Sequence, residues 1–287
     1  MMEETADHAY SLGTAPVMDT LREIFTSPNP EYDTLFINLG TILRNCSSNK
    51  NVTDAKREDR LLGRKSTTPA HILIKEGKQE ILKVTRDVCD LMASNERLMF
   101  PHVIVYFVNY RMCIPKEHYK PFTESEREMA LAEASLAGIV HGARKDGTYS
   151  KVVFIEVPIK SRDCPHRVLM KELARIKSGH NVVMVSNHRL DYHLHKFCNK
   201  FTLVDSFTGN LVAPRELPKK VFGVDSVPFL PITHAILGDK DDIKPSLKGK
   251  EKKLFIEAAE RSNWIAHSEE YVRLAIRNLK IPVPFTI

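Results

Sequence analysis

The stretch "DTLFINLGTIL", residues Asp33 to Leu43, is an almost unbroken run of apolar side chains interrupted by Asn38. Short runs rich in Val, Ile, Leu and Phe are typical of buried β-strands. Further runs of the same kind follow along the chain, at residues 102–110, 151–159, 181–187 and 201–206. We therefore predict a short strand at each of these positions, with the first over residues 33–43.

Helical patterns separate these runs. Residues 69–94 carry apolar side chains at helical spacing, and residues 123–126 have the Ser/Thr-x-x-Glu form of a helix-starting capping box. A further helix is predicted to end at Gly179, because glycine commonly terminates helices. Strands that alternate with helices favour βαβ units, and therefore an α/β fold with a central, mostly parallel sheet and flanking helices.

The organisation of the chain follows from where these patterns start and stop. Residues 1–30 are predicted to be an N-terminal extension, residues 31–225 the α/β domain, and residues 226–287 a small helical unit, because the strand signal ends near Asp225. Residues 46–69 are polar and charged, which predicts a mobile loop. Parallel sheets bind ligands beyond the carboxyl ends of their strands, so Asn38, Val108 with Asn109, residues 186–188 and the segment that leads to Asp239 mark a candidate site.

Composition narrows the class of protein. The 287 residues include 42 Lys and Arg against 36 Asp and Glu, which gives a formal net charge of +6 and favours an acidic partner such as nucleic acid. The 5 cysteines form no Cys-x-x-Cys pair, which is typical of a reducing compartment. No signal peptide and no membrane-length apolar run is present, so we expect a cytoplasmic protein without a membrane partner, in the host cytoplasm if the protein is viral.

The most specific motif is "GDKDDI", residues 238–243, and it follows "LFINLG", "VIVYFVNYR" and "VVMVSNHRLD" in order. Over residues 31–260 the chain resembles the 5′-nuclease family of flap endonucleases and bacteriophage 5′-3′ exonucleases, the RNase H type of phage enzyme. In that family "GDKDDI" corresponds to Gly-Asp-x-x-Asp-Asn-Ile. The resemblance implies a PIN-like domain followed by a helix-three-turn-helix unit, and cleavage that depends on metal ions held by carboxylates.

Most of the family's carboxylates are replaced in this chain. Of the acids that the resemblance implies, only Asp163, Asp239 and Asp242 remain, while other positions hold Asn38, Val108, Pro165, His166, His188 and Leu190. Two-metal cleavage of phosphodiesters needs carboxylates that hold both ions close together. We therefore predict that catalysis is largely lost, that no cofactor is required, and that Asp239 and Asp242 retain at most weak binding of Mg²⁺ or Mn²⁺.

A cluster of lysines follows the last acids. In the family this loop holds a phosphate of the duplex, and lysines beside a helix N-terminus attract phosphate without reading sequence. Lys120 matches a family lysine of the helical arch over the active site. The predicted nucleic-acid-binding residues are Lys120, Lys244, Lys248, Gly249, Lys250, Lys252 and Lys253.

Three functions remain open from the sequence. The first is a protein that binds DNA or RNA on a 5′-nuclease scaffold without efficient catalysis, and the second is a working metal-dependent 5′-nuclease with a reduced site. The third is a structural subunit that uses the fold for protein contacts. The features also have plainer explanations, since Asp239 to Asp242 suit a turn and a helix cap, and the lysines suit a solvated surface.

Overall fold

The computed structural model describes residues 15–27, 31–46, 50–63, 70–93, 102–107, 152–156, 180–239 and 243–261, with a few helical residues between 128 and 139. Two compact units divide the chain. Residues 1–109 and 122–212 form the first unit, and residues 110–121 and 213–287 form the second. The second unit therefore begins before residue 226, since its elements start at Pro214.

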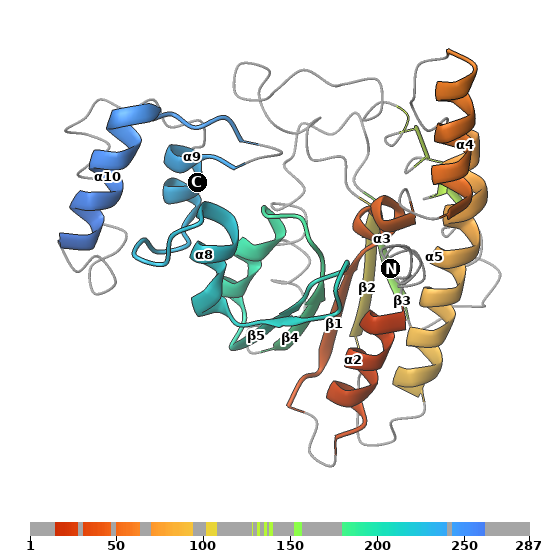
Figure 1. The fold of residues 1–287 in the computed structure, drawn as a ribbon. Coiled ribbons are helices and arrows are strands. Elements are labelled where there is room, and N and C mark those ends of the chain that lie inside the picture. The colour runs from red at the N-terminus through yellow and green to blue at the C-terminus, as the bar shows by residue number, and fades with distance from the viewer. Residues whose placement is uncertain are drawn as a thin grey trace, which may run out of the picture. The chain divides into compact units, whose positions relative to one another are not determined.

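The first unit contains a six-stranded sheet with the order β3-β2-β1-β4-β5-β6 (Figure 1). The strands are β1 (Thr34–Asn38), β2 (His102–Phe107), β3 (Val152–Glu156), β4 (Asn181–Val185), β5 (Lys200–Val204) and β6 (Leu211–Val212). Every neighbouring pair is parallel except β5 and β6, which are antiparallel. The predicted α/β class with a mostly parallel sheet is thus confirmed.

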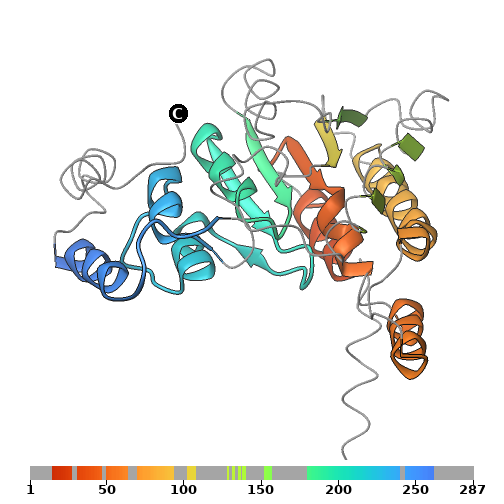
Figure 2. The ribbon, with the colours of Figure 1, turned by 90° about the horizontal axis from the view of Figure 1, so that it is seen from above.

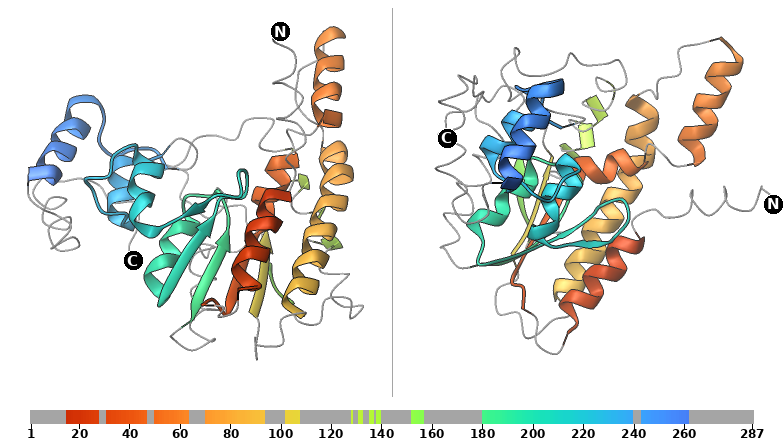
Figure 3. Two further views of the ribbon diagram at one scale, coloured as in Figure 1. Left: turned by 60° about the horizontal axis from the view of Figure 1, so that its bottom comes forward. Right: turned by 60° about the vertical axis from the view of Figure 1, so that its left-hand side comes forward.

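Helices of the first unit cover one face of this sheet (Figure 3). They are α2 (Ala15–Phe25), α3 (Leu39–Cys46) and α5 (Ala70–Ala93), and their apolar side chains share a core with Leu35, Ile37, Val183 and Val185. Leu35 and Ile37 stand two residues apart and so face the same side of the strand. The fully buried β1, in the middle of the sheet, explains why its sequence is a continuous apolar run.

Three predictions about elements need correction or extension. The strand predicted over residues 33–43 ends at Asn38, where α3 begins. The predicted mobile loop contains a helix, α4 (Lys50–Leu61), which lies on the outside of the first unit (Figure 2). Residues 15–25, within the predicted N-terminal extension, form α2 and bury Val17, Met18, Leu21 and Phe25 in the core. The helix predicted to end at Gly179 lies outside the described residues.

The second unit is helical in its described part. It contains η4 (Pro214–Glu216), α8 (Leu217–Phe222), α9 (Pro231–Leu237) and α10 (Gly249–Arg261). Pro231 starts α9 because proline suits the first helical position, and Gly238, with φ 65°, ends it. The core of this unit joins α9 to α10 through Val227, Ile232, Ile236, Leu237, Leu247, Phe255 and Ala259.

Candidate functional site

The carboxyl ends of β1 and β4 form the first candidate region. In the sheet, β2 lies on one side of β1 and β4 on the other, so the direction in which strands are added reverses at β1. Parallel sheets bind ligands at such topological switch points. Asn38 ends β1 and Ser186 follows β4, and both are buried. The sequence-predicted position of a site at this edge therefore coincides with a cluster of buried polar side chains.

Asn38 has a double role in this cluster. Its side-chain Oδ1 accepts a hydrogen bond from the Gly40 backbone N–H at 3.0 Å, which caps the N-terminus of α3. Its Nδ2 donates to Oδ2 of Asp191 at 2.8 Å. The two contacts assign the amide oxygen and nitrogen unambiguously, because a carboxylate only accepts and a backbone N–H only donates.

Asp191 is the carboxylate at the centre of the cluster, and it was not among the predicted site residues. The Ser186 hydroxyl donates to the same Oδ2 at 2.6 Å and in turn accepts from the His188 N–H at 2.9 Å. Asp191 is 0% exposed. Hydrogen bonds from Asn38 and Ser186 compensate a carboxylate that would be costly to bury without partners.

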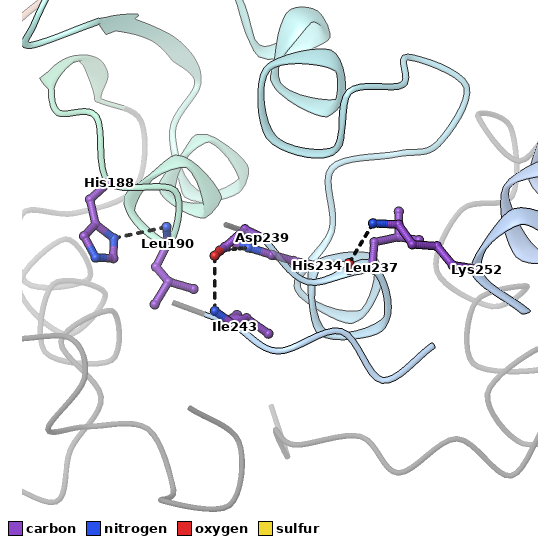
Figure 4. A network of polar contacts seen from close by, with 7 residues as sticks. All are labelled: His188, Leu190, His234, Leu237, Asp239, Ile243 and Lys252. Atoms are coloured by element: carbon purple, nitrogen blue, oxygen red, sulfur yellow. Dashed lines mark hydrogen bonds and ion pairs between the residues drawn. The ribbon is translucent and has the colours of Figure 1, made fainter. Parts of the chain in front are cut away.

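The neighbouring residues at this edge serve the local backbone. His188 Nδ1 accepts a long hydrogen bond of 3.4 Å from the Leu190 N–H (Figure 4). Asp205, which follows β5, accepts from the N–H groups of Phe207 and Thr208 and so closes the turn between β5 and β6. Among the described residues, no group of three or more His, Cys, Asp or Glu side chains is arranged to hold a metal ion.

The second candidate region lies in the second unit, around Asp239. Its Oδ2 lies 2.5 Å from Nε2 of His234, and its Oδ1 accepts from the Ile243 N–H at 3.2 Å (Figure 4). The side chains of His234 and Asp239 are 1% and 0% exposed. The His234 ring also packs against Phe222 and Phe229, with centroid distances of 5.7 and 5.8 Å. The predicted metal role of Asp239 remains a prediction.

The lysines after Asp242 occupy two kinds of position. Lys244, Lys248, Lys250 and Lys253 are exposed, and the last three lie at or beside the N-terminus of α10. Lys252 is half-buried, and its ammonium group donates to the carbonyl of Leu237 at the end of α9 at 3.2 Å (Figure 4). Gly249 has a φ of 51° and begins α10. The segment Lys244–Lys253, called the lysine segment below, thus presents exposed positive charge at a helix start.

Several predicted residues lie outside the described part of the chain. These are Lys120, Asp163 and Asp242, together with Val108, Pro165 and His166 at the replaced acidic positions. Asn38 and His188 belong to the first unit and Asp239 to the second, and each is described within its own unit. No helix in the described part of the chain is long and apolar enough to cross a membrane.

Sequence reasoning missed Asp191 for a local reason. The resemblance predicted the motif over Ser186 to Leu190, and Asp191 stands one position beyond it. The missed signal was an Asp a few residues beyond a strand, outside the predicted motif. In comparisons with known proteins, no family model matches the chain and no curated protein is similar to it in sequence.

Proposed function

We propose that this protein binds nucleic acid through the phosphate backbone, on a PIN-like 5′-nuclease scaffold that has lost efficient catalysis. The observation that carries the proposal is the lysine segment, where Lys248, Lys250 and Lys253 are exposed around the start of α10. Backbone N–H groups at a helix start and lysine ammonium groups both attract phosphate oxygens. The resemblance to 5′-nucleases supports the lysine segment as the surface that contacts the duplex, because the corresponding loop of that family holds a duplex phosphate.

The buried cluster in the first unit supports the second half of the proposal. The position where the family's first strand ends in an acid holds Asn38, whose amide is committed to Gly40 and Asp191. The Asp191 carboxylate accepts from two neutral donors, Asn38 and Ser186. A site for two divalent ions needs several ionised carboxylates with free lone pairs, and these two contacts engage Oδ2 of Asp191 internally.

The test is binding of DNA and RNA duplexes over a range of salt concentrations. We expect dissociation constants on the order of micromolar or tighter, with affinity that falls as salt rises because bound lysines release counterions. Reversing Lys248, Lys250 and Lys253 to Glu should weaken binding about a hundredfold, equally for different sequences, since phosphate contacts carry no sequence information.

A matched control is available on α5. Lys78, Lys83 and Arg86 are all exposed there, and reversing all three to Glu changes the net charge by the same amount. Equal loss of affinity in both triple variants would mean that only net charge matters and would reject the lysine segment as the binding surface. Salt-independent binding, or none, would favour a structural subunit. Metal-dependent cutting by the unmodified protein would favour the working nuclease.

A further inference from the structure

The buried pair of His234 and Asp239 joins the end of α9 to the segment that leads to the lysines. Asp239 lies just beyond α9, and its Oδ1 accepts from the N–H of Ile243 while its N–H donates to the carbonyl of the same residue at 3.0 Å. His234, one turn back on α9, contacts the other carboxylate oxygen. One side chain therefore fixes Ile243, the residue immediately before Lys244, relative to α9.

A second set of contacts attaches the lysine segment itself to α9. The N–H groups of Ser246 and Leu247 both donate to the carbonyl of Ile236, at 3.1 and 3.3 Å. The Ser246 hydroxyl donates to the carbonyl of Ala235 at 3.1 Å, and Lys252 reaches that of Leu237. These contacts satisfy carbonyls at the helix end that have no partner within the helix.

Gly238 lets the chain pass closely enough for both sets of contacts. Its φ of 65° lies in the left-handed region, and an added Cβ would stand 2.5 Å from the Pro245 nitrogen and 2.7 Å from the Ile243 oxygen. Only glycine fits such a conformation and such a close approach. The backbone before Lys244 and Lys248 is therefore held against α9 at its start and in its middle.

We infer that Asp239 is a positioning residue for the lysine segment. The inference rests on the proposed function and adds which contacts hold the lysine segment in position for binding. Ordering a flexible backbone costs conformational entropy for every residue that becomes fixed, and a segment ordered on folding does not incur that cost on binding. The carboxylate, shared between His234 and Ile243, holds Lys244 and Lys248 in place before nucleic acid arrives.

The same contacts argue against Asp239 as a metal ligand. A cation needs carboxylate lone pairs directed at it, and each oxygen of Asp239 already uses one lone pair in a hydrogen bond while the side chain is 0% exposed. If Asp239 positions lysines, its removal weakens binding equally with and without divalent ions. If Asp239 holds a metal, its removal weakens binding only when the metal is present.

The experiment compares Asp239→Ala, Asp239→Asn and the wild-type chain in binding to a fluorescent DNA duplex of mixed sequence, in EDTA and in Mg²⁺. Asp239→Ala should bind about tenfold more weakly, and its dependence of log affinity on log salt should flatten by about 0.9 for each phosphate that the lysines no longer neutralise. Asp239→Asn keeps an oxygen for the Ile243 N–H and the shape of the side chain, so it should recover most of the affinity and the slope.

A control separates positioning from plain loss of stability. Val227 is 1% exposed in the core of the same unit, and Val227→Ala should lower the melting temperature while affinity and salt slope stay as in the wild type. All variants are measured at a temperature where circular dichroism shows them folded. If Asp239→Ala fails to fold, His234→Gln carries the comparison, because it changes the partner of Oδ2 of Asp239 and should weaken binding in the same direction with and without Mg²⁺.

The possible results distinguish failure of the positioning role of Asp239 from failure of the proposed nucleic-acid binding. Lysine-dependent binding by the wild type, together with unchanged affinity and slope in Asp239→Ala, would overturn the positioning role and leave the proposed function standing. An effect of Asp239→Ala that appears only in Mg²⁺ would also overturn it, in favour of a metal ligand. Absence of binding by the wild-type chain would sink the proposed function itself, and the inference with it.

Discussion

At the scale of single residues, the Nδ2 atom of Asn38 distinguishes this side chain from an aspartate at the carboxyl edge of the sheet. Its oxygen caps α3 and its nitrogen donates to Asp191 at 2.8 Å. Asp at this position would keep the cap, because its carboxylate also accepts from Gly40, but would replace the donor by a second negative oxygen. The amide is therefore one of the donors, with the Ser186 hydroxyl, that stabilise the neighbouring buried carboxylate.

We predict that Asn38→Asp lowers the free energy of unfolding by about 2–4 kcal/mol, because two buried carboxylates then face each other without a donor between them. We further expect Mn²⁺ to restore part of this loss, since a divalent ion bound only by the folded state stabilises that state. Thermal unfolding with and without Mn²⁺ measures both effects.

The control for this prediction is Asn38→Ala, which removes the cap and the donor but adds no charge. It should be destabilised in a way that Mn²⁺ does not reverse. Equal stabilisation by Mn²⁺ of the wild type, Asn38→Ala and Asn38→Asp would show that the ion acts elsewhere, and the interpretation of this edge as a reduced metal site would fail.

Cys198 gives a second prediction at the residue scale. Burial, with the negative charge of Asp33 adding to it, raises the pKa of the Cys198 thiol to about 12 from its ordinary value of 9.0. Only the thiolate reacts, so alkylation at pH 8 should be about a thousandfold slower in the folded chain than in the unfolded chain. The raised pKa also means that this group stabilises the fold below about pH 9 and that the effect fades as pH rises toward 12.

Mass spectrometry of the peptide that contains Cys198, after timed exposure to iodoacetamide, measures this protection. Denaturant supplies the unfolded reference for the same peptide. Rapid labelling of the folded chain at pH 8 would show that the thiol is accessible and ionised, contrary to its burial in the structure.

At the scale of elements, the sequence predicted the helix whose apolar side chains form a long periodic stripe and missed a helix without such a stripe. The helix predicted over residues 69–94 is α5 (Ala70–Ala93), because its stripe of Ile81, Val84 and Val88 packs into the core. The helix α4 was missed because its residues are mostly charged and carry no apolar stripe. Opposite charges at Lys50, Asp54 and Arg57 stand three or four positions apart, a spacing that supports a helix without burial.

The helix α2 was missed although its signal was present. Val17, Leu21 and Phe25 recur every four residues and all are buried. That stripe is short, and it follows an acidic start of the chain that is typical of an exposed extension. The turn at Asn38 was also not predicted, because "DTLFINLGTIL" is apolar on both sides of the asparagine and only the contact between Asn38 and Gly40 marks where the strand becomes a helix.

Two adjacent lysines on α10 have different environments, so we expect substitutions of Lys252 to affect stability and substitutions of Lys253 to affect binding of nucleic acid. Lys252 donates to the end of α9, whereas Lys253 is exposed and lies 3.8 Å from Glu257 in a surface pair. We predict that Lys252→Met lowers the free energy of unfolding by about 1 kcal/mol, because a carbonyl at a helix end loses a charged donor. Lys253→Met should change stability by less than about 0.5 kcal/mol and weaken binding of nucleic acid severalfold.

Thermal unfolding and salt titrations on the two variants test this division, and each variant is the control for the other. Loss of stability in Lys253→Met with none in Lys252→Met would contradict the assignment of their roles. Equal losses of affinity at unchanged stability would place both ammonium groups on the binding surface.

At the scale of the whole molecule, the sequence located the candidate regions better than it identified their chemistry. The strands β1 to β4 lie within the predicted runs, β5 overlaps its run, and α10 lies within the predicted helical unit. The pairing of Asp191 with Asn38 joins residues 153 positions apart, and the contact of Asp239 with His234 depends on the turn at Gly238. Neither contact follows from spacing in the sequence, because both are set by how the chain packs.

The last prediction concerns cleavage by the full chain. Freed of contaminating nucleases, it should cut 5′-flap or nicked duplexes about a thousandfold or more slowly than an intact 5′-nuclease. Losing one positioned metal ion removes several kcal/mol of charge stabilisation, and each 1.36 kcal/mol costs about tenfold in rate. The reason in this chain is that positions 38, 108, 166, 188 and 190, where the resemblance implies acids, hold no carboxylate.

The positive control restores Asp at those five positions together and seeks cutting that appears only with Mg²⁺ or Mn²⁺. Binding in EDTA, measured on the same preparations, shows that the chain still holds its substrate when it does not cut, because phosphate contacts through lysines need no metal. Robust metal-dependent cutting by the unmodified chain, abolished by Asp239→Ala, would overturn both the proposed loss of catalysis and the positioning role of Asp239, since the carboxylate would then have to bind an ion in addition to its contacts with His234 and Ile243.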